Sequence, residues 1–229
     1  MNYEPGNDFF GGFSPQDGTI DFYGRVNSIL NKEMLVLDVG AGRGSWFEDG
    51  KCQYRKDIQY IKNKVFKLIA VDVDEAVLDN KSAHESLVMI GGRIPLEDNS
   101  VDLIIADFVL EHIQDCTLFI NELNRVLKKG GYFCARTPHK WNYVSIFARI
   151  LKNSKHSTIL KFAQPNRKEI DVFPTAYLMN TLSDIKLFFR GYKNFTFIYR
   201  SEPSYFWGNK IIYKIQQFFH HLNPSLILF

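Results

Sequence analysis

A short apolar run that ends in three alternating glycines constrains the fold of this chain more than any other feature. Residues 34–39 (Met-Leu-Val-Leu-Asp-Val) are compact and apolar, and Gly40, Gly42 and Gly44 follow. The run predicts a buried strand. Glycines allow a ligand to approach the backbone closely, and ligands of open α/β sheets bind at the carboxyl ends of the strands. A dinucleotide fingerprint would place its third glycine one residue later, at Ser45.

Further apolar runs alternate with helical patterns along the chain. Strands are predicted at 67–73, 87–90, 101–106 and 132–135. A helix is predicted at 20–30, before the first strand, and the helices between the strands include a short one capped by Asp74 and a strongly amphipathic one capped by Asp115. This alternation predicts a doubly wound, mostly parallel α/β sheet covered on both faces, the Rossmann-like arrangement. A later helix–strand pair at 175–190 and 194–200 extends that sheet.

The composition fits a globular protein with one core. Of the 229 residues, 45% are apolar and 23% are charged, which excludes wholesale disorder. The three cysteines are an odd number without a CxxC pair, so we expect no disulfide framework or cysteine zinc site and a reducing, cytoplasmic location. No secretory signal is evident at the N-terminus. The longest uncharged stretch, 215–229, is too short and too polar to span a membrane.

An acidic residue at the end of the second predicted strand adds to the glycine turn. Asp72 is placed there to accept hydrogen bonds from the two hydroxyls of a ribose. Asp74 lies close by and is the better helix cap, which leaves Asp72 available. The two features together indicate a cofactor that contains a nucleoside.

Four ordered stretches resemble the class I S-adenosylmethionine-dependent methyltransferases. They are Val-Leu-Asp-Val-Gly-Ala-Gly-Arg-Gly (36–44), Ile-Ala-Val-Asp-Val-Asp (69–74), Arg-Ile-Pro-Leu-Glu-Asp-Asn-Ser-Val-Asp-Leu-Ile (93–104), and Val-Leu-Glu-His-Ile (109–113) with Glu-Leu-Asn-Arg-Val-Leu-Lys-Lys-Gly-Gly (122–131). The resemblance covers about residues 34–138. It is nearest to the branch that includes the ubiquinone-biosynthesis O-methyltransferases and many glycan-cluster enzymes.

The resemblance implies contacts with the methionine part of S-adenosylmethionine. Three residues would present their backbone to it, and they are Gly40, Ala41 and Gly42. Asp38 would brace this loop, which Gly44 completes. Asp107, at the end of the fourth strand, would lie near the methionine part or the transferred methyl group.

The resemblance also implies contacts with the nucleoside part of this cofactor. Asp72 would hold the ribose, and Val73 would lie against the adenine. Arg93 and Ile94 would line its other side. Where the family often has an acid that meets the adenine amino group, this chain has Ile90. The family sheet normally ends in an antiparallel hairpin, and only its first strand, 195–199, is evident here.

Methyl transfer to an oxygen can use a general base, and the candidates are His112, His139 and Asp107. A lone histidine is also common as a structural residue, so both interpretations stay open. Some relatives bind a metal with two acids and a histidine on the helix near Glu111. Phe108 stands at the position of the first acid, and we therefore expect no metal.

The charge is distributed unevenly. Residues 139–229 carry 13 Lys and Arg against 4 Asp and Glu, whereas residues 1–138 are net acidic. Ile211, Ile212, Ile215, Phe218, Phe219 and Leu222 fall on one face of a predicted helix. That face packs on the chain's own core, on a second subunit in a homodimer, or on a membrane surface as a peripheral contact.

We expect one methyltransferase domain in four parts. These are an N-terminal helical segment (1–33), the cofactor-binding core (34–138), a substrate-cap insertion (139–174), and a last helix–strand pair with the amphipathic helix (175–229). The expected acceptor is a small molecule, a glycan or a lipid-linked molecule, methylated on oxygen. The alternatives are a cofactor-binding subunit without activity, and a nucleotide-dependent oxidoreductase or epimerase. Nucleic acid is not the expected substrate, because no Asn/Asp-Pro-Pro-aromatic motif is present.

Overall fold

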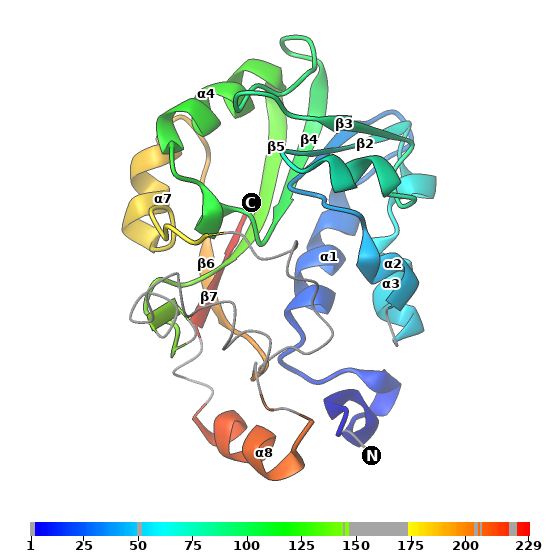
Figure 1. Ribbon diagram of the computed structural model, residues 1–229, viewed down its shortest axis with the longest axis vertical. Coiled ribbons are helices and arrows are strands. Elements are labelled where there is room, and N and C mark those ends of the chain that lie inside the picture. Colours follow the sequence, from blue (N-terminus) through cyan, green and yellow to red (C-terminus); the bar gives the residue numbers. More distant parts are fainter. Residues whose placement is uncertain are drawn as a thin grey trace.

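The computed structural model describes residues 3–49, 52–143, 145–146, 174–203, 206, 208–219 and 224–229. Their strands form one seven-stranded sheet in the order β3-β2-β1-β4-β5-β7-β6 (Figure 1). All pairs are parallel except the two that involve β7. The strands are β1 (Leu35–Val39), β2 (Lys67–Asp72), β3 (Glu85–Val88), β4 (Val101–Asp107), β5 (Leu127–Pro138), β6 (Phe197–Arg200) and β7 (Pro224–Leu228). The predicted α/β fold with a mostly parallel sheet is confirmed.

Helices lie on both faces of the sheet. The α-helices are α1 (Gly18–Ile29), α2 (Ser45–Asp49), α3 (Gln53–Gln59), α4 (Cys116–Val126), α7 (Leu182–Phe188) and α8 (Lys210–Phe218). Single turns of 3-10 helix are η1 (Pro5–Asp8), η2 (Phe10–Gly12), η3 (Lys62–Lys64), η4 (Glu75–Asp79) and η5 (Leu110–His112). The predicted caps are confirmed, because the Asp115 carboxylate accepts from the Leu118 amide and that of Asp74 from the Ala76 amide.

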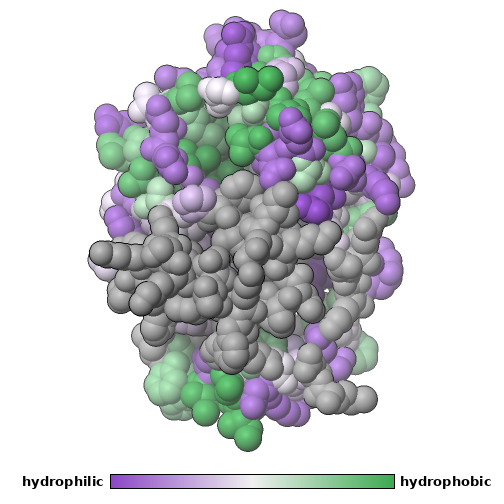
Figure 2. Space-filling model, viewed as in Figure 1, coloured by the Kyte–Doolittle hydropathy of each residue, from purple (hydrophilic) through white to green (hydrophobic). Residues whose placement is uncertain are grey.

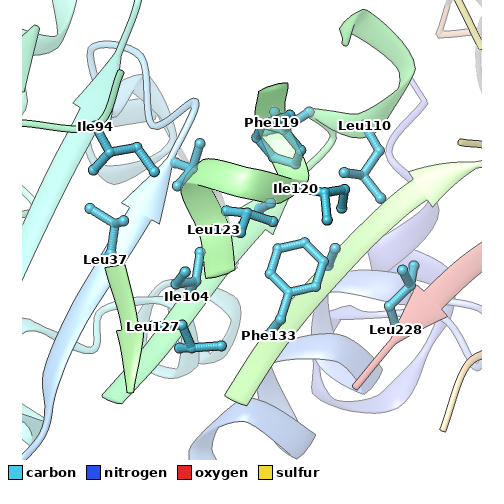
Figure 3. Packing of buried hydrophobic residues seen from close by; sticks show 14 of the residues in the cluster. Leu37, Ile94, Ile104, Leu110, Phe119, Ile120, Leu123, Leu127, Phe133 and Leu228 are labelled. Atoms are coloured by element: carbon cyan, nitrogen blue, oxygen red, sulfur yellow. The ribbon is translucent and has the colours of Figure 1, made fainter. Parts of the chain in front are cut away.

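The sheet buries its side chains on two faces, as alternation along a strand requires. On one face Leu123 and other α4 residues pack against Leu37, Ile104 and Phe133 of the sheet (Figure 3). On the other face Val36 packs with α1 and α3 in a second cluster. Each such buried side chain contributes about 1.5–3 kcal/mol, so the glycine turn is mounted on a strand that is fixed from both sides.

The last strand corrects the sequence analysis, in which the second strand of the hairpin was missing. Residues 224–228 form β7, which pairs antiparallel with β5 and with β6. Pro224 is tolerated because it is the first residue of the strand. The apolar residues after it, including Leu226 and Ile227, are fully buried between the two neighbours. The end of the uncharged stretch 215–229 therefore forms an interior strand of the sheet, paired on both sides.

Several element boundaries differ from the prediction, and β5 begins at Leu127, five residues before the predicted start at 132. The third strand ends at Val88, because Asp72 and Val88 are the last pair in the register between β2 and β3. The helix expected over 175–190 begins only at Leu182. Residues before it are held as a loop, since the amides of Ala176 and Tyr177 both donate to the Glu111 carbonyl and Tyr177 has a positive φ of 52°. Of the helices in the described ranges, none has the length and apolar character to cross a membrane.

The topology also places α8. Because β6 runs parallel to β5, it ends at the same edge of the sheet as β1, β2 and β4. The connection from β6 to β7, which contains α8, therefore leaves the sheet at its carboxyl edge. In Figure 1, α8 lies apart from the sheet at the lower end of the molecule, next to the N-terminal segment.

Candidate functional site

A large open pocket lies at the carboxyl ends of β1, β2 and β4. Its volume is about 1580 Å³, which exceeds the ~300–1,000 Å³ of an ordinary ligand site. It is lined by residues 39–47 after β1, by residues within 72–81 after β2, by Met89 and Gly92 after β3, and by residues within 108–119 after β4, together with Pro174. The pocket has room for two small molecules side by side.

The glycine turn lines this pocket, and each of its three glycines has a positive φ. A Cβ on Gly40 would come within 2.5 Å of Val109, and one on Gly44 within 2.5 Å of the Asn80 amide. A Cβ on Gly42 would meet nothing within 4 Å. Gly40 and Gly44 are thus required by the packing behind the turn, whereas Gly42 faces open space in the pocket.

Asp72 and Asn80 hold the turn from the β2 side. The Asp72 carboxylate accepts a hydrogen bond from the Gly42 amide at 2.9 Å and another from the Asp74 amide at 3.0 Å. The Asn80 side chain donates to the carbonyls of Ala41 (3.3 Å) and Gly42 (3.0 Å). Asp72 and Asn80 are both buried and both line the pocket. The structure therefore places Asp72, rather than Asp38, in contact with the turn.

Asp38 lies near the end of β1. None of the residues that the structure describes forms a hydrogen bond or ion pair with its carboxylate. Burial, together with the negative charges of Asp107 and Asp72, raises the pKa of Asp38 to about 7. A carboxyl group in this state favours a positively charged ligand, because a nearby cation stabilises its ionised form.

The end of β4 is fixed by a buried ion pair. Arg136 of β5 binds the Asp107 carboxylate through two hydrogen bonds of 2.7 Å and also donates to the Thr19 hydroxyl of α1. Its guanidinium lies over the rings of Phe22 (5.6 Å) and Phe108 (4.6 Å). Phe108 has a positive φ of 59° and lines the pocket. Backbone strain of this kind costs about 1–3 kcal/mol and clusters at functional sites.

Of the two candidate histidines, His112 lines the pocket and His139 does not. His112 lines the pocket, and its Nδ1 lies 2.9 Å from the Pro174 carbonyl oxygen. A carbonyl only accepts, so Nδ1 carries the proton and Nε2 is the basic nitrogen of the neutral ring. His139 is not among the lining residues, and its Nδ1 accepts from the Trp141 amide at 3.1 Å. Burial lowers the pKa of His139.

Glu111 belongs to a buried group of hydrogen-bonded polar side chains. Its carboxylate accepts from the Thr137 hydroxyl at 2.9 Å, and that hydroxyl accepts from the Asn180 amide at 2.6 Å. Burial raises the pKa of Glu111 to about 7, against the opposing effect of its hydrogen bonds. These three buried residues connect η5 to the end of β5 and to the loop before α7.

The pocket brings together seven of the twelve predicted site residues, namely Gly40, Ala41, Gly42, Gly44, Asp72, Val73 and His112. The other five do not line it, namely Asp38, Arg93, Ile94, Asp107 and His139. Ile94 is fully buried in the core, and Arg93 is exposed. The described residues hold no group of three or more His, Cys, Asp or Glu that could bind a metal.

The sequence analysis did not identify two residues that support the site, Arg136 and Asn80. Arg136 carries a signal that could have identified it, since it is the one charged residue in the otherwise uncharged segment Tyr132–Pro138. Asn80 carries no such signal. Its role depends on two carbonyls that lie 38 and 39 residues earlier in the chain.

The comparisons with known proteins agree with this geometry. Residues 37–135 match the sequence profile of a family described as methyltransferase domain. Over this stretch, which is less than half of the chain, the sequence matches a methyltransferase domain, and the relatives described below support the class I S-adenosylmethionine-dependent kind. The match begins in β1, just before the glycine turn, and ends in β5, so it includes most of the segments that line the pocket. S-adenosylmethionine is therefore the cofactor of this domain.

Curated relatives match the same part of the methyltransferase domain. A probable S-adenosylmethionine-dependent methyltransferase of Mycolicibacterium smegmatis is 33% identical over 109 residues, which is 46% of this chain and 38% of the relative. A demethylmenaquinone methyltransferase of Staphylococcus aureus is 28% identical over 109 residues, 44% of this chain and 42% of the relative. The matched region thus spans about two fifths of the length of these relatives.

A solved structure extends the likeness to nearly the whole fold. Geranyl diphosphate C-methyltransferase from Streptomyces coelicolor, in complex with Mg²⁺, a substrate analogue and S-adenosyl-L-homocysteine, has a TM-score of 0.55. The alignment covers 91% of this chain and 73% of that one at 15% identity. At this identity the likeness concerns the fold.

Proposed function

We propose that the chain transfers the methyl group of S-adenosylmethionine to an oxygen of a small-molecule, glycan or lipid-linked acceptor. The observation that carries the proposal is the glycine turn, held open above Gly42 by Asp72 and Asn80 at the edge of a pocket with room for two molecules. A dinucleotide-dependent oxidoreductase or epimerase is the alternative activity, and a cofactor-binding subunit without turnover is the non-enzymatic one.

The residues present fit the cofactor. The open space above Gly42 accepts the methionine part. Asp38 does not line the pocket, and its carboxylate acts on the ammonium group of the methionine part through its electrostatic field from behind the turn. Asp72 retains lone pairs on both carboxylate oxygens with which to accept the ribose hydroxyls. Val73, which is 60% exposed inside the pocket, offers an apolar surface to the adenine. Arg93 and Ile94 were expected to line the other side of the adenine. Met89, which lines the pocket after β3, is proposed to take that place.

The bound cofactor supplies a sulfonium methyl group that is open to in-line attack. What the chain adds is alignment of donor and acceptor, which alone can account for much of the rate. Phe108 and His112 both line the pocket close to the turn. With its proton on Nδ1, the His112 ring can take the acceptor's hydroxyl proton at Nε2, a role worth about 100- to 10,000-fold in rate.

Paired histidine variants test this assignment. We expect His112→Gln to lower kcat by about 100-fold or more while leaving the affinity for S-adenosylhomocysteine within about twofold, because general-base catalysis acts on the chemical step. His139→Gln is the matched control, since His139 lies outside the lining, and it should retain near-normal kcat. Equal losses in the two variants, or a loss confined to His139→Gln, would remove His112 from the mechanism.

An acceptor screen tests the activity itself. Purified protein is incubated with methyl-labelled cofactor and with sugar, phenol, lipid-linked and isoprenoid diphosphate acceptors. The relatives' names justify including demethylmenaquinone and geranyl diphosphate. We expect label in an acid-stable ether of one oxygen acceptor. Label only in a carbon–methyl product would contradict oxygen as the target, and cofactor binding without transfer to any acceptor would favour the non-catalytic subunit.

A further inference from the structure

An unusual apolar surface lies on α8, outside the cofactor site. Ile211, Ile215 and Phe218 are spaced so that they share one face of the helix, and their exposed fractions are 72%, 55% and 76%. Phe219 extends this surface and is 47% exposed. We call these four residues the α8 apolar face. The sequence left open whether this stripe packs on the chain's own core, on a second subunit or on a membrane. Leu222, which also belongs to the predicted stripe, lies outside the described residues.

The opposite side of α8 is anchored to the protein. Tyr213 is fully buried, and its ring lies 5.3 Å from Tyr3 and 5.2 Å from Phe206, between ring centroids. Lys210 forms a 3.0 Å ion pair with Asp8. The helix begins at an Asn209 cap whose side chain accepts from two amides. These contacts fix the helix so that its apolar face points away from the protein.

The charges beside this face favour an anionic occupant. The segment Lys210–Phe218 contains two lysines and no acidic residue. Lys210 is paired with Asp8, so the charge that Lys214 adds is the one the argument uses, together with an excess of nine basic over acidic residues in 139–229. A second copy packed face to face would bring lysines together without an acidic partner on either helix. An apolar stripe flanked by lysines is typical of a helix that lies in the interface of an anionic membrane.

The position of α8 relates this surface to the pocket. The β6–β7 connection leaves the sheet at the carboxyl edge, where the pocket opens. Figure 2 shows hydrophobic side chains gathered at the lower end of the molecule, where α8 lies, with hydrophilic ones beside them. We propose that the α8 apolar face docks on an anionic lipid surface and holds the pocket edge close to that surface. The docking is independent of the proposed methyl transfer.

Vesicle co-sedimentation tests this inference on the full chain. We expect binding to vesicles of phosphatidylglycerol and phosphatidylcholine that weakens at high salt, and much weaker binding to phosphatidylcholine alone. The double variant Ile215→Ser with Phe218→Ser should bind about tenfold or more weakly, and Lys214→Gln about fivefold more weakly. Removing residues 209–229 is not a suitable test, because it also removes β7.

The controls make the result specific. Phe66→Ser changes a phenylalanine that is 69% exposed just before β2, at the opposite edge of the sheet, and should bind like the parent. All variants should keep parental S-adenosylhomocysteine affinity, which separates lipid docking from the cofactor site. Absence of parental binding to anionic vesicles at low salt would overturn the proposal. So would parental binding by the Ile215/Phe218 variant, or a stable parental dimer that this variant dissociates.

Discussion

Replacing Asp72 with asparagine gives the sharpest test of the site. The carboxylate accepts from the Gly42 amide at 2.9 Å and from the Asp74 amide at 3.0 Å. An asparagine offers one acceptor oxygen in place of two and no charge. A hydrogen bond to a charged group is worth about 1.5–3 kcal/mol. We therefore expect Asp72→Asn to lower the free energy of unfolding by about 1.5–3 kcal/mol through the turn.

The same substitution should weaken cofactor binding, because Asp72 is also proposed to accept the ribose hydroxyls. A loss of about 1.5–3 kcal/mol corresponds to about a 10- to 150-fold higher Kd for S-adenosylhomocysteine. Calorimetry measures the Kd, and urea unfolding measures the stability. Asp74→Ala is the matched control: it removes the η4 cap, worth about 1 kcal/mol, but Asp74 does not line the pocket. An Asp72→Asn protein with parental Kd would refute the role of Asp72.

The remaining predictions concern metal, charge and pH. Because Phe108 stands where a first acidic ligand is expected, methyl transfer should survive exhaustive chelation, and activity that returns only with added magnesium would contradict this. Arg136→Leu should lower the free energy of unfolding by about 3–5 kcal/mol, because it leaves the Asp107 carboxylate buried and unpaired. The double variant Arg136→Leu with Asp107→Leu should lose less stability. An equal loss of stability in the single and the double variant would count against the ion pair. S-adenosylhomocysteine affinity should increase as the pH rises through about 7, because Asp38 ionises there, and Asp38→Asn should abolish that dependence. The folded protein holds this proton to higher pH than the unfolded chain does, so the parent should also lose stability relative to Asp38→Asn as the pH rises from 3.8 to about 7.

The parts of the fold that depend on local pattern were predictable from the sequence. Apolar runs that stop at glycine or aspartate gave β1, β2 and β4 nearly at their true ends, and Asp115 marked the start of α4. The location of the pocket at the carboxyl edge of the sheet was predictable as well, because parallel strands all end at the same edge. These features depend on residues only a few positions apart.

The parts that depend on distant pairing were not predictable. β7 is only five residues long and becomes a strand because β5 and β6 pair with it on both sides. The contact of Asp72, rather than Asp38, with the glycine turn depends on a hydrogen bond to the Gly42 amide, 30 residues earlier in the chain. The stripe on α8 was visible as a pattern, but only the burial of Tyr213 on the opposite side shows which way the helix faces.

Calorimetric titration of the unmodified chain with S-adenosylhomocysteine, and separately with NAD, tests the central claim most directly. The account predicts one S-adenosylhomocysteine per chain, bound with release of protons near pH 7 as Asp38 ionises, and no heat with NAD. Saturable binding of NAD without binding of S-adenosylhomocysteine would contradict the account and favour the oxidoreductase interpretation.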